Sequence, residues 1–208
     1  MKNVNGIWLP DHEKHLTQWA EHGVYGKWTY QSNKMIAALG FITGCKQAVD
    51  IGGHCGLWSK ELIKIFDHVH AFEPMAAHRE CFVENVPERY TLHPCALGEK
   101  AGHISLHSTE GSSGDTWING EGQIPMLTLD SFNLSPDFIK LDCEGYEYFA
   151  LKGGEETIKR CKPVIIVEQK PGNGQKYGVR ETEAVTYLQS LGATLRGEMV
   201  GDFVLSWA

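Results

Sequence analysis

An open α/β fold, with a mostly parallel sheet and helices on both of its faces, is predicted by three features of this sequence. Short apolar runs alternate with helical patterns along most of the chain, which is typical of a doubly wound sheet. The run 48–51 ends in a glycine-rich turn and precedes an amphipathic helix, and the next run, 68–73, ends in an acid. Together these segments have the form of a nucleotide-binding βαβ unit.

The other elements follow in order along the chain. Helices are expected at 11–21, 32–42, 76–85, 146–161 and 181–191, and strands at 90–97, 138–142 and 163–168. Asp11 is expected near the N-cap of the first helix. The segment 99–122, rich in glycine and serine, is expected to leave the core, with a strand at 104–108 that pairs with 126–132. The last two strands, 193–199 and 203–207, would form a hairpin that adds an antiparallel strand.

The length of 208 residues predicts a single domain, with residues 1–44 as an N-terminal helical cap and 45–208 as the core. Five aromatic residues lie in the cap, and packing against the core or contact with a substrate are both open for them: Trp8, Trp19, Tyr25, Trp28 and Tyr30.

Composition excludes several classes of protein. A net charge of -7 argues against general binding of nucleic acid backbones. No apolar run approaches the length of a membrane span, and the N-terminus lacks the apolar core of a signal peptide. The six cysteines are scattered without a Cys-x-x-Cys pair, so reduced thiols are expected. These features predict a cytoplasmic protein.

The glycine turn distinguishes between nucleotide cofactors. A dinucleotide fingerprint that ended at Gly53 and Gly56 would need a glycine where Ile51 stands. Instead an acid, Asp50, lies two residues before Gly52. S-adenosylmethionine (SAM) has no pyrophosphate but carries an ammonium and a sulfonium, which acids near the loop can stabilise. The pattern therefore favours SAM over NAD.

In an open parallel sheet, ligands bind at the carboxyl ends of the strands. The residues at those ends are Asp50, Gly52 and Gly53, then Glu73 and Pro74, then Ala96 and Leu97, then Asp142 and Glu144, and last Glu168 and Lys170. Glu73 could accept two hydrogen bonds from a ribose diol. Three carboxylates converging in one cleft would repel one another unless a cation, a metal or a substrate hydroxyl satisfies them. Asp142, Glu144 and Glu168 are therefore candidate functional residues.

His54 and the loop 171–178 each allow two interpretations. His54 follows Gly53 directly, so it could lie along the cofactor or serve in capping and packing. The loop 171–178 could close over the cleft as a lid or could be an ordinary solvent-exposed loop.

Several segments in order resemble the FkbM family of SAM-dependent methyltransferases: VDIGGHCG, FEP, PCALGEKAG, FIKLDCEGYEYFALKGG and PVIIVE. The resemblance covers about 30–168 and is most specific at 140–147. It implies a class I Rossmann-like fold with a seven-stranded sheet, SAM as the cofactor, and methylation of hydroxyl oxygens on sugars or natural products. His54 departs from the small or amide residues that are usual in the family's glycine loop.

The resemblance also implies roles for individual residues. Asp50, Gly52, Gly53 and Gly56 would form the methionine-side loop, Glu73 would hold the ribose, and Ala96 and Leu97 would flank the adenine. Asp142 and Glu144 would face the methionine end and the acceptor.

The sequence thus predicts an O-methyltransferase that acts on a saccharide or small natural product and releases S-adenosylhomocysteine. An alcohol is a weak nucleophile, so a base should assist; Glu144 is the first candidate, with Asp142 and Glu168 as alternatives. A divalent metal held by Asp142 and Glu168 is another route, which oxygen ligands alone do not establish. We therefore assign no metal ligand, and the sequence leaves the acceptor and the oligomeric state undefined.

Two competing classes remain. A non-catalytic protein could keep the fold and bind SAM or no ligand. An NAD-dependent oxidoreductase is suggested by the Tyr-x-x-x-Lys spacing of Tyr148 and Lys152, with Ser135 upstream. However, Ser135 precedes its strand, away from the carboxyl edge, and Ile51 breaks the glycine fingerprint.

Overall fold

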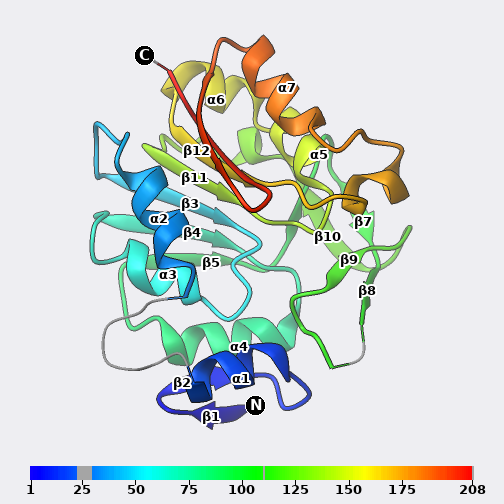
Figure 1. The fold of residues 1–208 in the computed structure, drawn as a ribbon. Helices are drawn as coiled ribbons and strands as arrows, with labels where there is room; N and C mark the ends of the chain where they lie inside the picture. The colour runs from blue at the N-terminus through cyan, green and yellow to red at the C-terminus, as the bar shows by residue number, and fades with distance from the viewer. Residues whose placement is uncertain (23–29, 110, 208) are drawn as a thin grey trace.

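The computed structural model describes residues 1–22, 30–109 and 111–207. Its centre is a mixed seven-stranded sheet with the order β13-β14-β12-β11-β3-β4-β5 (Figure 1). The strands are β3 (Gln47–Ile51), β4 (His68–Phe72), β5 (Tyr90–His93), β11 (Phe138–Leu141), β12 (Val164–Glu168), β13 (Thr194–Met199) and β14 (Asp202–Ser206). From β12 to β5 neighbouring strands pair parallel, whereas β14 pairs antiparallel with both β12 and β13.

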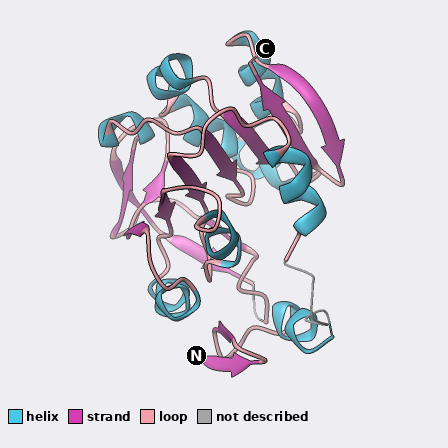
Figure 2. Ribbon diagram, turned by 90° about the vertical axis from the view of Figure 1, so that its left-hand side faces the viewer, coloured by secondary structure: helices cyan, strands magenta, loops and turns pink. Residues whose placement is uncertain are grey.

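Helices cover both faces of the sheet (Figure 2). They are α2 (Ser32–Leu39), α3 (Leu57–Leu62) and α4 (Ala76–Asn85) on one face, and α5 (Glu147–Lys152), α6 (Glu155–Cys161) and α7 (Glu183–Ser190) on the other. Because side chains alternate along a strand, Val49 packs toward α5–α7 while Ala48 packs toward α2–α4. The predicted α/β architecture with a hairpin at the end is therefore present.

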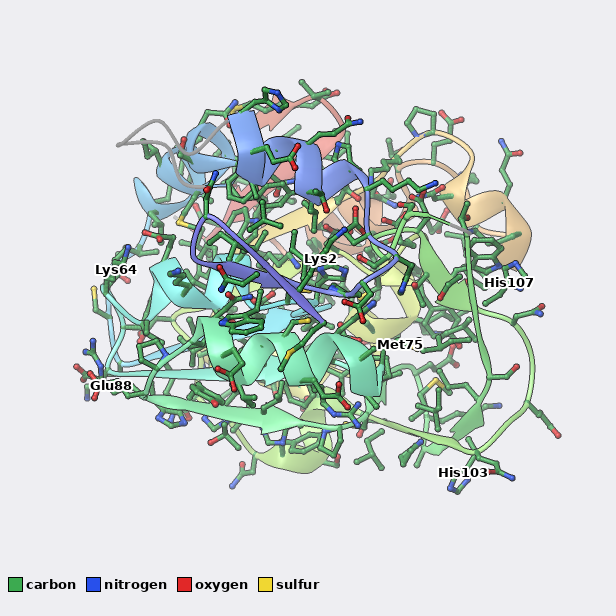
Figure 3. The ribbon with its side chains drawn as sticks, turned by 90° about the horizontal axis from the view of Figure 1, so that it is seen from below. Lys2, Lys64, Met75, Glu88, His103 and His107 are labelled. Carbon is green, nitrogen blue, oxygen red and sulfur yellow. The ribbon has the colours of Figure 1, made fainter. Side chains whose placement is uncertain are left out.

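The N-terminal segment contains a hairpin that the sequence did not predict. Strands β1 (Lys2–Val4) and β2 (Ile7–Leu9) pair antiparallel and lie beside α4, together with α1 (His15–His22). Figure 3 shows the hairpin, marked by Lys2, next to α4, whose first turn follows Met75. Figures 1 and 2 place the two termini at opposite ends of the molecule.

The expected N-cap of the first helix was wrong. Glu13 accepts a hydrogen bond from the backbone N–H of Leu16 at 2.8 Å, whereas Asp11 pairs with the N-terminal amino group at 3.0 Å. Of the five cap aromatics, Tyr25 and Trp28 lie outside the described residues.

The predicted strand 90–97 is two strands. β5 belongs to the central sheet and ends at His93. β6 (Ala96–Leu97) belongs to a separate three-stranded sheet with β10 (Ile124–Leu127) and β7 (Gly102–Ile104). Pro94 separates them, because proline has no N–H with which to continue the ladder. The excursion also forms a hairpin of β8 (Leu106–Ser108) and β9 (Thr116–Ile118), and the expected strand 126–132 ends in the short helix η1 (Leu129–Phe132).

The predicted helix 146–161 is interrupted at Gly153 and Gly154, where α5 ends and α6 begins. A Cβ atom at Gly153 would lie 1.9 Å from the carbonyl oxygen of Gly98, so only glycine fits at this position. Within the described ranges, no helix is both long and apolar enough to cross a bilayer.

Candidate functional site

A cavity of about 500 Å³ lies at the carboxyl edge of the sheet, within the usual size of a small-molecule site. Its wall combines the strand ends with the excursion and the N-terminal segment. Ten predicted site residues line it: Gly52, Gly53, His54, Glu73, Pro74, Ala96, Leu97, Asp142, Glu144 and Glu168. Two others, Asp50 and Gly56, are absent from the wall. The topology therefore brings most of the predicted residues together.

Asp50 is completely buried in the core beneath the glycine turn. Its Oδ1 lies 3.2 Å from Lys140 Nζ, and its Oδ2 accepts a hydrogen bond from Ser59 Oγ at 2.7 Å. Lys140 also donates to the carbonyl oxygen of Gly52 at 2.7 Å. Asp50 therefore holds the turn through Lys140, and its position does not favour the predicted direct contact with a cofactor.

The glycines of the turn are required by protein packing. Gly52 has a φ of +77°, and a Cβ atom there would lie 1.9 Å from the carbonyl oxygen of Asp142. At Gly56, with a φ of +80°, a Cβ atom would lie 2.6 Å from Val86. Gly53 differs, since its nearest neighbours would be 3.4 Å away. Of the three glycines, therefore, Gly53 alone could be glycine because a ligand approaches the backbone there.

Glu73 directly follows β4, and most of its hydrogen-bond acceptor sites are occupied by protein donors. Its Oε2 accepts from the backbone N–H of His54 at 2.8 Å, and its Oε1 accepts from the N–H of Met75 at 2.8 Å and contacts His78 Nδ1 at 3.2 Å. Burial by itself would raise the pKa of Glu73, but these hydrogen bonds and His78 lower it. A carboxylate has about four lone-pair sites, so one acceptor site remains for a ligand.

His54 belongs to a hydrogen-bonded chain that joins three distant segments. Its Nε2 lies 2.8 Å from Ser113 Oγ, and Ser113 donates through both Oγ and its backbone N–H to Glu13. Because the single hydroxyl proton goes to Glu13, His54 Nε2 must be the donor to Ser113. Burial lowers the pKa of His54 to about 4, which keeps the ring neutral. His54 thus lines the cavity and also joins the glycine turn to the excursion and to α1.

The three predicted carboxylates meet, with one oxygen from each within 4.8 Å of the others. Lys170 lies among them: its Nζ is 2.8 Å from Glu168 Oε2 and 3.2 Å from Glu144 Oε1. Asn173 donates to Glu144 Oε2 at 2.7 Å. Both oxygens of Glu144 therefore have partners, and the loop 171–178, which contains the short helix η2 (Asn173–Tyr177), is tied to the cluster.

The acids differ in protonation. Burial, with the adjacent Asp142 carboxylate, raises the pKa of Glu168 to about 9. Burial would also raise the pKa of Asp142, but Lys140 and Lys170 lower it below its usual value. Asp142 Oδ1 is buried and has no hydrogen-bond partner among the described residues. The cluster thus combines a protonated Glu168 with an ionised Asp142 that has a free acceptor atom.

The residues behind the oxidoreductase alternative lie away from the cavity. Tyr148 packs edge-on against Tyr187 of α7, with ring centroids 5.6 Å apart, and Lys152 pairs with Glu99. Ser135 lies before β11, where its N–H donates to Gln47. The structure gives these residues no shared site.

Sequence reasoning missed several residues of the site. Glu13, Ser113 and Trp117 line the cavity from the N-terminal segment and the excursion, and Lys140 lines it from β11. Tyr30, for which contact with a substrate was left open, lines it as well. The signal available for Lys140 was a charge inside the apolar run FIKL. Lys170 was placed at the carboxyl edge but was given no role.

The pattern of the methyltransferase FkbM domain matches residues 50–195, which is most of the chain. A mixed, mostly parallel sheet between helices, with a cavity at the carboxyl ends of its parallel strands, agrees with that class of enzyme. This protein belongs to the FkbM methyltransferase family. A search of curated proteins gives no match.

Solved structures with the same fold include three methyltransferases. A methyltransferase FkbM from Methylobacillus flagellatus has a TM-score of 0.56 at 21% identity over 81% of this chain, which spans 45% of the length of that protein. A putative O-methyltransferase from Klebsiella pneumoniae has a TM-score of 0.52 at 15% identity, covering 89% of this chain and 84% of that one. A TehB-like SAM-dependent methyltransferase from Corynebacterium glutamicum has a TM-score of 0.50 at 12% identity, covering 92% and 93%.

Proposed function

We propose that this protein is a SAM-dependent O-methyltransferase whose acceptor is a hydroxyl group of a saccharide or small natural product. The observation that carries the proposal is the cavity itself. It is lined by the glycine turn, by Glu73 and by Asp142, whose buried Oδ1 has no hydrogen-bond partner among the described residues. The putative O-methyltransferase with the same fold is consistent with transfer to oxygen.

The residues of the cavity fit SAM by their chemistry. The free acceptor site of Glu73 suits a ribose hydroxyl, and Ala96 and Leu97 offer apolar surface to an adenine. The orphaned Asp142 Oδ1 would gain a partner from an ammonium group or a hydroxyl. When bound, SAM supplies an electrophilic methyl group on its sulfonium.

The protein's own contribution is alignment and acceptance of a proton. Alignment of two reactants can supply several kcal/mol of the barrier. Glu144, the first candidate from sequence, is held by Lys170 and Asn173, and Glu168 carries a proton at neutral pH. Asp142 is ionised and its buried Oδ1 has no hydrogen-bond partner within the described part of the chain, so we assign acceptance of the hydroxyl proton to Asp142.

A polyhydroxylated acceptor suits this end of the cavity. Carboxylate oxygens can accept hydrogen bonds from neighbouring hydroxyls, and the aromatic rings of Tyr30 and Trp117 add apolar surface to the wall. The net charge of -7 argues against nucleic acid as the acceptor. Residence in the cytoplasm stays a prediction from the sequence.

Isothermal titration with SAM, S-adenosylhomocysteine and NAD tests the cofactor. We expect SAM and S-adenosylhomocysteine to bind. In a denaturation experiment, a ligand concentration roughly 100-fold above the dissociation constant should raise the free energy of unfolding by about 2.7 kcal/mol. Glu73→Gln keeps the shape and should weaken SAM binding by about 1.5–3 kcal/mol, the range for hydrogen bonds to a charged group. Glu80→Gln, on the exposed side of α4, is the control. Binding of NAD alone would contradict the proposal.

A mass-spectrometric screen of hydroxylated acceptors then separates an enzyme from a non-catalytic binder. We expect a methylated product, and Asp142→Asn should lower turnover by about 10²–10⁴-fold. Because Asp142 also faces the predicted methionine end, SAM affinity of this variant must be measured alongside. Tight SAM binding without turnover on any acceptor would support the non-catalytic alternative.

A further inference from the structure

The acidic cluster raises the question of which cation neutralises it. Three carboxylates with oxygens within 4.8 Å of one another form a typical oxygen-ligand set for a divalent ion. Protonation of Glu168 removes one of the negative charges, and the others repel unless positive charge lies nearby. Here that charge comes from the chain itself.

The ammonium of Lys170 takes that place. Its Nζ lies 2.8 Å from Oε2 of the protonated Glu168 and 3.2 Å from Oε1 of Glu144, so its charge faces both acids through charge-assisted hydrogen bonds. Lys34 adds a second ammonium, whose Nζ lies 3.9 Å from Oε1 of Glu168 and pairs with Asp202. A divalent ion bound by the three carboxylates would have to displace Lys170 and would meet repulsion from both ammonium groups.

We propose that Lys170 is a positioning residue that substitutes for a metal ion: it neutralises Glu144, holds the protonated Glu168 in place, and leaves Asp142 Oδ1 as the acceptor without a partner among the described residues. The inference rests on the proposed function, since it describes how that site would act on a hydroxyl without a divalent cation. Lysine also fixes the geometry, because its ammonium, unlike an exchangeable ion, is tethered through β12 to the sheet.

Mn²⁺ binding tests the inference directly. With purified protein titrated by Mn²⁺ and followed by electron paramagnetic resonance, wild type should leave the ion free up to millimolar concentration. Lys170→Met removes the charge at similar length, so it should bind one Mn²⁺ with at least about tenfold higher affinity. Lys170→Arg keeps the charge and should behave as wild type. Lys176→Met changes the net charge equally but lies over Trp117, so it should not bind the ion.

If Lys170→Met fails to fold, the Mn²⁺ titration of the wild type still tests the inference. One tightly bound Mn²⁺ in wild type, lost in Asp142→Asn, would overturn the inference, as would a folded Lys170→Met that binds no more Mn²⁺ than Lys176→Met. Measuring SAM binding in the presence of EDTA distinguishes a failure of the Lys170 inference from a failure of the proposed function. Loss of SAM binding without metal would contradict the metal-free site, whereas failure to bind SAM with or without metal would contradict the methyltransferase assignment.

Discussion

The ammonium of Lys140 lies 3.2 Å from Oδ1 of Asp50, on adjacent parallel strands whose register pairs the two residues. Both side chains point to the face of the sheet that packs against α3, where Ser59 adds a hydrogen bond to Asp50. Lys140 in turn binds the carbonyl oxygen of Gly52. This buried pair therefore connects β3, β11 and the glycine turn.

Removing one partner of this pair should be strongly destabilising. Lys140→Met leaves the carboxylate of Asp50 buried without a counter-charge, so the free energy of unfolding should fall by about 3–5 kcal/mol in urea denaturation. Lys152→Met breaks the surface pair with Glu99 and should cost less than about 1 kcal/mol. Equal losses in the two variants would show that the Asp50–Lys140 pair has no special weight.

Alanine at two neighbouring glycines separates packing from ligand approach. Gly52→Ala forces a Cβ atom onto the backbone of Asp142 at positive φ, and should lower the free energy of unfolding by about 1–3 kcal/mol or more. Gly53→Ala has ordinary contacts and should stay within about 1 kcal/mol of wild type. If ligand backbone approach matters at Gly53, that variant should lose SAM affinity while remaining stable. Thermal unfolding and titration of both variants check this; a stable Gly52→Ala would be the contrary result.

Stability should decline with pH because of Glu168. Its pKa rises from 4.5 in the unfolded chain to about 9 in the fold, so the native state holds a proton that the unfolded state releases. The contribution is complete below the unfolded pKa and is lost as pH rises toward the folded pKa. Between pH 7 and 8.5 the free energy of unfolding should fall by up to about 1.4 kcal/mol per pH unit.

His54 titrates at about 4, below this window, whereas Glu147 titrates at about 7 and adds to the slope at the lower end of the window, so the contribution of Glu168 is read from the difference between wild type and a variant at position 168. Urea denaturation at several pH values measures the slope. Glu168→Gln should flatten it, and Glu84→Gln on the exposed face of α4 should not. An unchanged slope in Glu168→Gln would mean that the glutamic acid is ionised in the native protein.

Ser113→Ala tests the chain from His54 to Glu13. It removes the hydroxyl between the two and leaves the buried N–H of His54 without a partner. The free energy of unfolding should fall by about 1–3 kcal/mol. Ser112→Ala, whose side chain makes no hydrogen bond with the residues that the structure describes, should change it by at most about 0.5 kcal/mol. Identical melting temperatures for the two variants would argue that the chain does not stabilise the fold.

Much of the fold was predictable because its signals are local. Apolar runs ending in glycine or an acid identified β3, β4, β11 and β12, and the rule for parallel sheets placed their carboxyl ends at one edge. The gathering of Asp142, Glu144 and Glu168 was predicted on that basis alone, and the structure brings them together. The break at Pro94 is local as well, since it arises from a missing N–H, whereas Gly153 is required by its contact with Gly98, which only folding brings near.

What the tertiary structure decided was the partner of each charged group. The sequence contains Asp50, Lys140 and Lys170, but only strand register and the return of the chain after β12 bring Lys140 to Asp50 and Lys170 to Glu144. Glu13 reaches Ser113 across 100 residues, a separation that no periodic pattern encodes. Secondary structure follows largely from neighbours along the chain. The protonation state of a buried carboxylate, and whether its oxygens have hydrogen-bond donors, depend instead on atoms that folding brings near.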